Sequence, residues 1–230
     1  MLFIIMIVFG LLSMLVSTVL KNKFTTYSRI PLISGLSGKE VAERMLKFNG
    51  IYDVQITNIP GQLTDHYNPL DKTVNLSPEV YEGRSIASAA IAAHECGHAV
   101  QHATAYSMLM LRSRLVPIVN ISSNIMRWVF IFGIGFYVMQ SNYYVLLVII
   151  VLQAIVTLFS IITLPVEFDA SKRGLVFIQE SGIIKSDEEY KGAKDALTWA
   201  GLTYFVAALA SVAQLLYFLL RLNGSRRSND

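Results

Sequence analysis

Residues 143–165 read YYVLLVIIVLQAIVTLFSIITLP, and this stretch decides the fold class. It contains no charged residue, and Gln153 is its only strongly polar member. At about 1.5 Å per residue, a helix of this length crosses the roughly 30 Å of hydrocarbon in a bilayer. The sequence therefore predicts a membrane-spanning helix here.

Three further stretches of the 230-residue chain extend this pattern. Residues 1–20 and 200–220 are uncharged, whereas residues 116–139 carry Arg127 at mid-segment, where it must reach a membrane face or pair inside the bundle. Residues 140–142 would form a tight hairpin to the next span. A cleaved signal peptide is the alternative for residues 1–20, but no Lys or Arg precedes that run and no small-residue cleavage site follows it. We expect about four spans in a mainly α-helical integral membrane protein.

The overall composition agrees with a protein that contacts the lipid bilayer. Hydrophobic residues make up 53% of the chain and charged residues 15%, against about a quarter charged in soluble domains. The net charge of +3 and the lack of a basic stripe argue against nucleic acid as a partner. The single cysteine, Cys96, excludes an intrachain disulfide framework and a cysteine-rich zinc module.

The parity of the spans decides which polar segments share a side of the membrane. Two crossings separate residues 21–115 from residues 166–199, so both segments lie on one side. Nine basic residues flank the spans there, which favours the cytoplasm for that side; they are Lys21, Lys23, Arg29, Arg112, Arg114, Lys172, Arg173, Lys191 and Lys194. The polar tail, residues 221–230, argues the other way, because its three arginines would then face outward.

Residues 21–115 predict a small α+β subdomain. Ser37 and Glu40 have the spacing of a capping box, which predicts a helix over residues 38–48. Short strands are expected within residues 51–59 and over residues 73–76. From Ser85 to about Arg114 the chain favours one long helix or two joined ones. Ser186 and Glu189 repeat the capping spacing in the second polar segment.

The motif that carries chemistry is His94-Glu95-Cys96-Gly97-His98. Residues i and i+4 share one helix face, so His94 and His98 can reach one ion while Glu95 lies beside it. This H-E-x-x-H pattern is typical of zinc hydrolases and predicts one Zn²⁺ per chain, with Glu95 as the catalytic base. Cys96 lies on another face of the helix and should pack rather than bind metal.

A catalytic zinc needs a third protein ligand, for which the sequence offers two candidates. His102 shares the helix face, but on an unbroken helix it lies about 12 Å along the axis from His94, so we expect a supporting or packing role. Glu167 follows the third span on the same side of the membrane as the motif, and it is the preferred ligand. Asp169 and Asp195 are candidates to orient a ligand imidazole, although each is also acceptable as a solvated surface acid.

Residues 63–69 form a second polar cluster. His66 or Tyr67 could stabilise the oxyanion formed on a substrate carbonyl. The alternative is a turn in which Asp65 and Asn68 cap the backbone before Pro69. The strand expected over residues 73–76 could align an extended substrate by edge pairing.

These motifs together carry a family resemblance. The chain resembles the YugP-type neutral zinc metallopeptidases of bacterial membranes in LTDHYNP (63–69), AHECGHAVQH (93–102), LPVEFDAS (164–171) and LTY (202–204). The resemblance covers nearly the whole chain and implies a multi-span membrane protein with zinc on the H-E-x-x-H helix and peptidase activity. Glu167 to Ala170 also resembles the third-ligand segment of the CAAX prenyl protease and heat-shock membrane protease group, where an Asp stands at the position of Ser171.

The sequence thus predicts a membrane-bound zinc endopeptidase with a zincin-like subdomain, His94, His98 and Glu167 as ligands and Glu95 as base. Its partner would be a peptide or protein substrate, and its active site would face the cytoplasm of a bacterial cell. Two alternatives stay open: a non-catalytic scaffold or sensor held together by zinc, and a zinc hydrolase of a non-peptide substrate.

Overall fold

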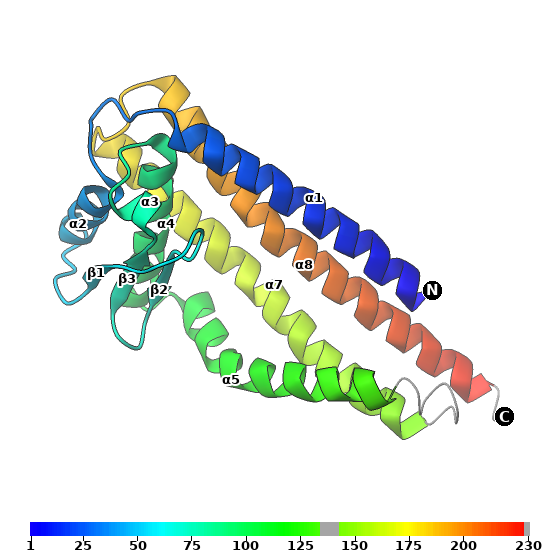
Figure 1. The fold of residues 1–230 in the computed structure, drawn as a ribbon. Coiled ribbons are helices and arrows are strands. Elements are labelled where there is room, and N and C mark those ends of the chain that lie inside the picture. The colour runs from blue at the N-terminus through cyan, green and yellow to red at the C-terminus, as the bar shows by residue number, and fades with distance from the viewer. Residues whose placement is uncertain (134–142, 228–230) are drawn as a thin grey trace. The chain divides into compact units, whose positions relative to one another are not determined.

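A computed structural model describes residues 1–133 and 143–227 of the chain, which are mainly helical (Figure 1). In chain order the elements are α1 (Leu2–Ser28), α2 (Gly38–Phe48), β1 (Gln55–Asn58), β2 (His66–Asn68), β3 (Thr73–Leu76), α3 (Pro78–Tyr81), α4 (Ile86–Ala103), α5 (Ser107–Trp128), the π-helix η1 (Val129–Gly133), α7 (Tyr143–Glu180) and α8 (Asp187–Arg227).

Three of these helices are long and apolar enough to cross a membrane. They are α1, α7 and the part of α8 up to Asn223, and they correspond to the predicted spans 1–20, 143–165 and 200–220. The predicted span 116–139 falls on α5, η1 and residues beyond them. Its last residues and the predicted hairpin 140–142 lie outside the described residues, so this fourth span stays a prediction.

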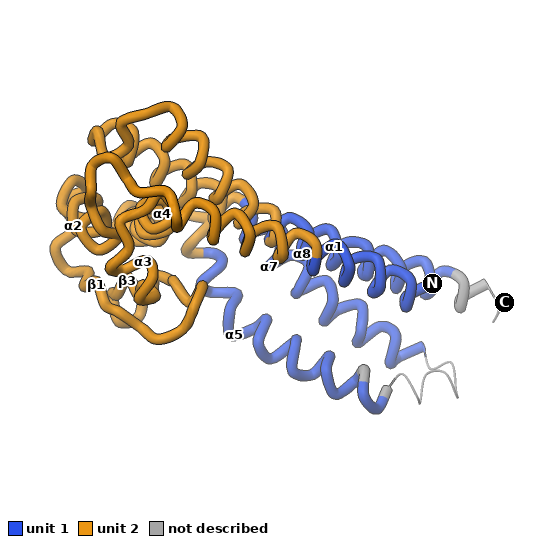
Figure 2. The backbone as a smooth tube through the Cα atoms, turned by 45° about the horizontal axis from the view of Figure 1, so that its top comes forward, with its two compact units in different colours: residues 1–14, 111–164, 204–230 blue, residues 15–110, 165–203 orange. Residues whose placement is uncertain are grey.

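The chain divides into two compact units (Figure 2). Unit 1 comprises residues 1–14, 111–164 and 204–230, and unit 2 comprises residues 15–110 and 165–203. Within unit 1, Met126, Leu146 and Phe218 belong to a small apolar cluster. Unit 2 holds a larger core, which includes Val41 and Met45 of α2 and many alanines of α4.

Helix boundaries in unit 2 follow the capping residues read from the sequence. Before α2, Ser37 Oγ accepts the amide of Glu40 and the Glu40 carboxylate accepts the amide of Ser37, at 3.3 and 2.7 Å. Ser186 and Glu189 make the same reciprocal pair before α8, at 3.1 and 3.3 Å. Both predicted capping boxes are confirmed, because each satisfies amides that the first helical turn leaves without partners.

The helix expected from Ser85 to Arg114 is two helices, α4 and α5. Ala105, between them, has a φ of 49°, a left-handed conformation that interrupts the helical hydrogen bonding. By contrast, Pro165 does not end α7, which continues to Glu180. Most of residues 166–199 is therefore helical, and only residues 181–186 connect α7 to α8.

The three strands form one sheet in the order β1-β3-β2. β3 pairs in parallel with β1 and antiparallel with β2. The expectation that residues 73–76 offer an edge to a substrate is wrong, because β3 is the central strand and its backbone groups are used on both sides. β2 is an edge strand, and it lies against α4.

Candidate metal centre

Helix α4 carries the two histidines of the motif. It begins at Ser85, whose Oγ accepts the amide of Ser88, and its many alanines let it lie buried in the core of unit 2. Candidate ligand atoms of His94, Glu95 and His98 all lie within 4.8 Å of one another. The imidazole rings stand edge to face, with centroids 4.8 Å apart. The predicted i, i+4 arrangement is therefore present.

Small residues let α7 approach α4 at the motif. A Cβ placed on Gly97 of α4 would lie 2.5 Å from the carbonyl oxygen of Ala170 on α7. A Cβ on Gly174 of α7 would lie 2.9 Å from the carbonyl carbon of Ala93. Neither distance is tolerable for a real Cβ, so the two helices touch backbone to backbone. This close crossing puts the start of the polar half of α7 beside His94 and His98.

Glu167 reaches both histidines from α7. Its Oε2 lies 3.5 Å from His94 Nε2 and 3.6 Å from His98 Nε2, and the side chain is buried. These separations are long for hydrogen bonds. They match the roughly 3.3–3.6 Å between two ligand atoms that each lie about 2.0–2.2 Å from a tetrahedral zinc ion. The two distances from Glu167 thus fit a shared zinc ion, and all three side chains offer donor atoms that zinc prefers.

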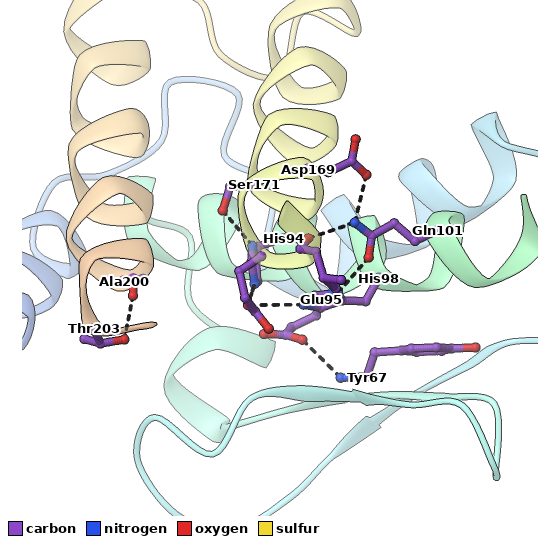
Figure 3. A network of polar contacts seen from close by, with 11 residues as sticks. Tyr67, His94, Glu95, His98, Gln101, Asp169, Ser171, Ala200 and Thr203 are labelled. Atoms are coloured by element: carbon purple, nitrogen blue, oxygen red, sulfur yellow. Dashed lines mark hydrogen bonds and ion pairs between the residues drawn. The ribbon is translucent and has the colours of Figure 1, made fainter. Parts of the chain in front are cut away.

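The other ring nitrogen of each histidine has its own partner. His94 Nδ1 lies 3.0 Å from Ser171 Oγ, and His98 Nδ1 lies 3.1 Å from Gln101 Oε1 (Figure 3). Gln101 Nε2 donates to Val166 O and to Asp169 Oδ2, both at 2.8 Å, so its Oε1 must accept from the ring. Contacts of this kind fix the tautomer that leaves Nε2 free for a metal.

The sequence did not predict that Ser171 and Gln101 contact the ligand histidines. Ser171 stands where related motifs have an Asp, and its hydroxyl nevertheless reaches His94. Gln101 follows His98 by three residues, a spacing that puts both on one helix face and that could have identified it. Asp169 contacts Gln101 and the guanidinium of Arg173, so it reaches His98 only through the amide of Gln101.

The side chain of Glu95 contacts the sheet. Its Oε2 accepts the backbone amide of Tyr67, on edge strand β2, at 3.0 Å (Figure 3). Burial alone would lower the pKa of His98, but the nearby carboxylates of Glu167 and Glu95 raise it. A positively charged ion is therefore favoured among these carboxylates.

The remaining predicted residues lie around this group. His102 lies one turn beyond His98 on the unbroken helix α4. Its Nδ1 is 2.7 Å from the hydroxyl of Tyr67. The ring of His66 is exposed, with Nδ1 2.8 Å from Thr64 O. Asp195 accepts from Tyr27 and pairs with Lys23, both at 2.7 Å, rather than with a motif histidine.

The turn alternative for residues 63–69 is wrong for His66–Asn68, which form strand β2, although Asp65 and Asn68 each accept a backbone amide. Asp65 Oδ1 accepts the amide of Ser77, and Asn68 Oδ1 accepts the amide of Leu70.

Cys96 is fully buried, with Sγ 3.7 Å from Ala42 O, and burial raises the pKa of its thiol. Cys96 therefore packs as a neutral thiol, as expected.

Comparison with known proteins agrees with this geometry. Residues 2–223 match the family described as "Putative neutral zinc metallopeptidase", and the chain belongs to this family. It is 42% identical over 209 residues to a Bacillus subtilis (strain 168) protein named "Putative membrane protease YugP", with 91% of each chain covered. The comparison with solved structures gave no match. The family resemblance read from the sequence is confirmed.

Proposed function

We propose that this protein is a membrane-bound, zinc-dependent endopeptidase with one zinc ion per chain. The observation that carries the proposal is the position of Glu167 Oε2, 3.5 and 3.6 Å from the Nε2 atoms of His94 and His98. Three such ligands leave a fourth tetrahedral position for water, which is the mark of a catalytic rather than a structural zinc site.

Each residue has a defined task in this proposal. His94, His98 and Glu167 would hold zinc, which supplies Lewis acidity and lowers the pKa of water toward about 7. Glu95 accepts the proton of the attacking water and passes it to the leaving amine. The Tyr67 amide, 3.0 Å from Glu95 Oε2, holds the carboxylate in place between these two transfers.

The substrate is a peptide or protein segment. Edge strand β2 runs past Glu95 through Tyr67, so an extended peptide that paired with β2 would lie along the catalytic carboxylate. The oxyanion role of His66 or Tyr67 remains a hypothesis. Of the two, Tyr67 is favoured because it contacts Glu95, whereas the His66 ring is exposed.

The structural-zinc alternative requires a fourth protein ligand. His102 was the candidate, but its Nδ1 is 2.7 Å from the Tyr67 hydroxyl and it lies one turn beyond His98. This geometry favours an open fourth position. We propose that the zinc centre lies on the cytoplasmic side, because basic residues flank the spans there, and that the membrane is that of a bacterial cell, because the chain is 42% identical to a Bacillus subtilis protein.

The test compares purified full-length wild type with Glu95→Gln and Glu167→Ala, with Glu180→Gln at the exposed end of α7 as the control. Bound zinc and cleavage of an unfolded protein and a mixed peptide library are measured together. Glu95→Gln should keep zinc and lose about 10²- to 10⁴-fold in cleavage rate. Glu167→Ala should lose zinc, and the control should keep both. Zinc-loaded wild type that cuts nothing across the library would instead support the scaffold or non-peptide alternative.

A further inference from the structure

Arg127 stands in the middle of an uncharged segment. Residues 115–126 before it and residues 128–139 after it carry no charged side chain. Residues 115–126 lie in α5, and twelve helical residues measure about 18 Å, which is farther than an arginine side chain can reach. A guanidinium at this depth of a bilayer is costly unless an acidic group pairs with it.

Unit 1 supplies no such acidic group. Residues 1–14, 111–164 and 204–229, which make up all of this unit except the final residue, contain no Asp or Glu. Among the residues that the structure describes, Arg127 makes no ion pair or hydrogen bond, and its side chain is exposed. These residues of unit 1 therefore offer no counter-charge to Arg127.

Arg127 lines a cavity of about 480 Å³ between α5, α7 and α8 of unit 1 (blue in Figure 2). Gln153 and Ser160 of α7 and Ser211 and Gln214 of α8 also line it. Gln153 is 1% exposed, and its Nε2 donates to Ser211 O at 3.1 Å.

The depth of the cavity follows from the apolar segments. Gln153 is ten residues from Tyr143 and twelve from Pro165, the ends of one predicted span. Ser211 is similarly central in residues 200–220. Arg127, Gln153 and Ser211 are thus each near the middle of a separate segment, and all three meet at one cavity.

The α8 side of the cavity suits a helix as occupant. Ala207 and Ala210 line it, and their short side chains let another helix approach closely, whereas Ser211 is buried and its carbonyl accepts hydrogen bonds from α7. A helix lying on this face could place one polar side chain into the cavity beside Arg127.

We propose that this cavity binds a membrane-spanning helix of another protein, and that Arg127 pairs with an Asp or Glu near the middle of that helix. Lipid phosphates and fatty-acid carboxylates lie at the membrane faces, about 15 Å from the middle of a bilayer. A second copy of this chain is excluded, because its own spans carry no acidic residue. The inference goes beyond the proposed peptidase activity and does not depend on it.

The test uses full-length protein in phosphatidylcholine vesicles and synthetic Leu-rich spanning peptides with Lys at both ends. One peptide carries a single mid-span Asp and its matched partner carries Asn, and association is measured by energy transfer between labels. The Asp peptide should bind about 10- to 100-fold more tightly than the Asn peptide. Arg127→Gln should abolish this difference, and Arg127→Lys should keep part of it.

Arg114→Gln is the matched control, since it removes one arginine of the same helix at the boundary of the apolar segment. It should leave the Asp preference unchanged. Equal binding of both peptides by wild type, or an unchanged preference in Arg127→Gln, would overturn the proposal. Loss of the preference in vesicles rich in phosphatidylglycerol would also overturn it, because a lipid anion would then occupy the cavity.

Discussion

Two places in this chain gather polar side chains among mainly apolar helices. At the α4–α7 crossing in unit 2, both Nδ1 atoms of the motif histidines have partners from the chain itself, Ser171 and Gln101. At the α5–α7–α8 cavity in unit 1, Arg127 has no partner among the described residues. In our proposals, the chain itself supplies every protein ligand at the crossing, whereas the cavity takes its ionic partner from another protein.

The difference reflects how each place is built. At the crossing, the backbones of α4 and α7 touch at Gly97 and Gly174, which sets the position of α7 and its ligand side chain against α4. Preorganised ligands of this kind favour tight metal binding, because little side-chain entropy remains to be lost. The cavity is open and bordered by small residues, and such a surface suits an exchangeable partner.

The largest effect is expected from breaking the crossing with Gly97→Ala. The new Cβ would meet Ala170 O at 2.5 Å, so α7 must move and carry Glu167 away from the histidines. We expect the free energy of unfolding to fall by about 1–3 kcal/mol. We also expect cleavage to fall at least about 100-fold, since small displacements of catalytic groups have effects of that size.

Denaturant unfolding and zinc titration with a chromophoric chelator measure these effects. The matched control is Gly10→Ala, another helical glycine whose added Cβ has nothing within 4 Å. Its stability should stay unchanged or rise by up to about 1 kcal/mol. Gly97→Ala with wild-type stability and zinc affinity would show that the backbone contact does not set the site.

A smaller effect is expected from Ser171→Ala, which removes the contact with His94 Nδ1 and leaves the crossing intact. The affinity for zinc should fall about 10- to 100-fold, as is usual when a partner of a ligand histidine is lost. Competition with a fluorescent zinc chelator measures the change. Ser181→Ala, which removes only an intrahelical bond to Phe177 O, should bind zinc as wild type does. Equal losses in both variants would contradict a specific role for Ser171.

The smallest effect is expected from Tyr67→Phe. This change removes the hydroxyl near His102 but keeps the backbone amide that holds Glu95. The lost hydrogen bond is worth about 1 kcal/mol, so the catalytic efficiency measured in steady-state cleavage assays should fall less than about tenfold. If the turnover rate instead fell by about two orders of magnitude or more while KM stayed unchanged, the phenol would be assigned to the oxyanion.

The Tyr67→Phe variant should also differ from wild type in the pH dependence of its stability. Burial raises the pKa of Tyr67 to about 12 from its ordinary value of 10. The unfolded phenol therefore ionises first, and wild type should lose stability between about pH 10 and 12. Unfolding measured across this range in Tyr67→Phe should lack that component, while both proteins behave alike below it.

The sequence was informative wherever the signal is local. Capping pairs such as Ser37 with Glu40 fix helix starts through contacts within four residues. The H-E-x-x-H spacing places His94 and His98 on one face of any helix. Glu167 could be predicted as the third ligand because a carboxylate directly after an apolar span is unusual and indicates a function.

What the sequence could not supply depends on contacts between distant elements. The partnership of Ser171 with His94 requires the register of α7 on α4, which Gly97 and Gly174 set in space. The strand order β1-β3-β2 likewise follows from packing, and no local pattern says that the last strand is central. For the same reason the sequence admits Asp195 as a site residue, although the fold pairs it with Lys23 and Tyr27.

X-ray absorption at the zinc edge, on full-length protein in detergent, tests the proposed centre most directly. Wild type should show two imidazole ligands, with oxygen atoms as the only other ligands of the zinc. Glu167→Gln should lose the zinc or change its oxygen ligands. A third imidazole, which would point to His102, or a spectrum unchanged in Glu167→Gln would contradict a catalytic zinc held by His94, His98 and Glu167.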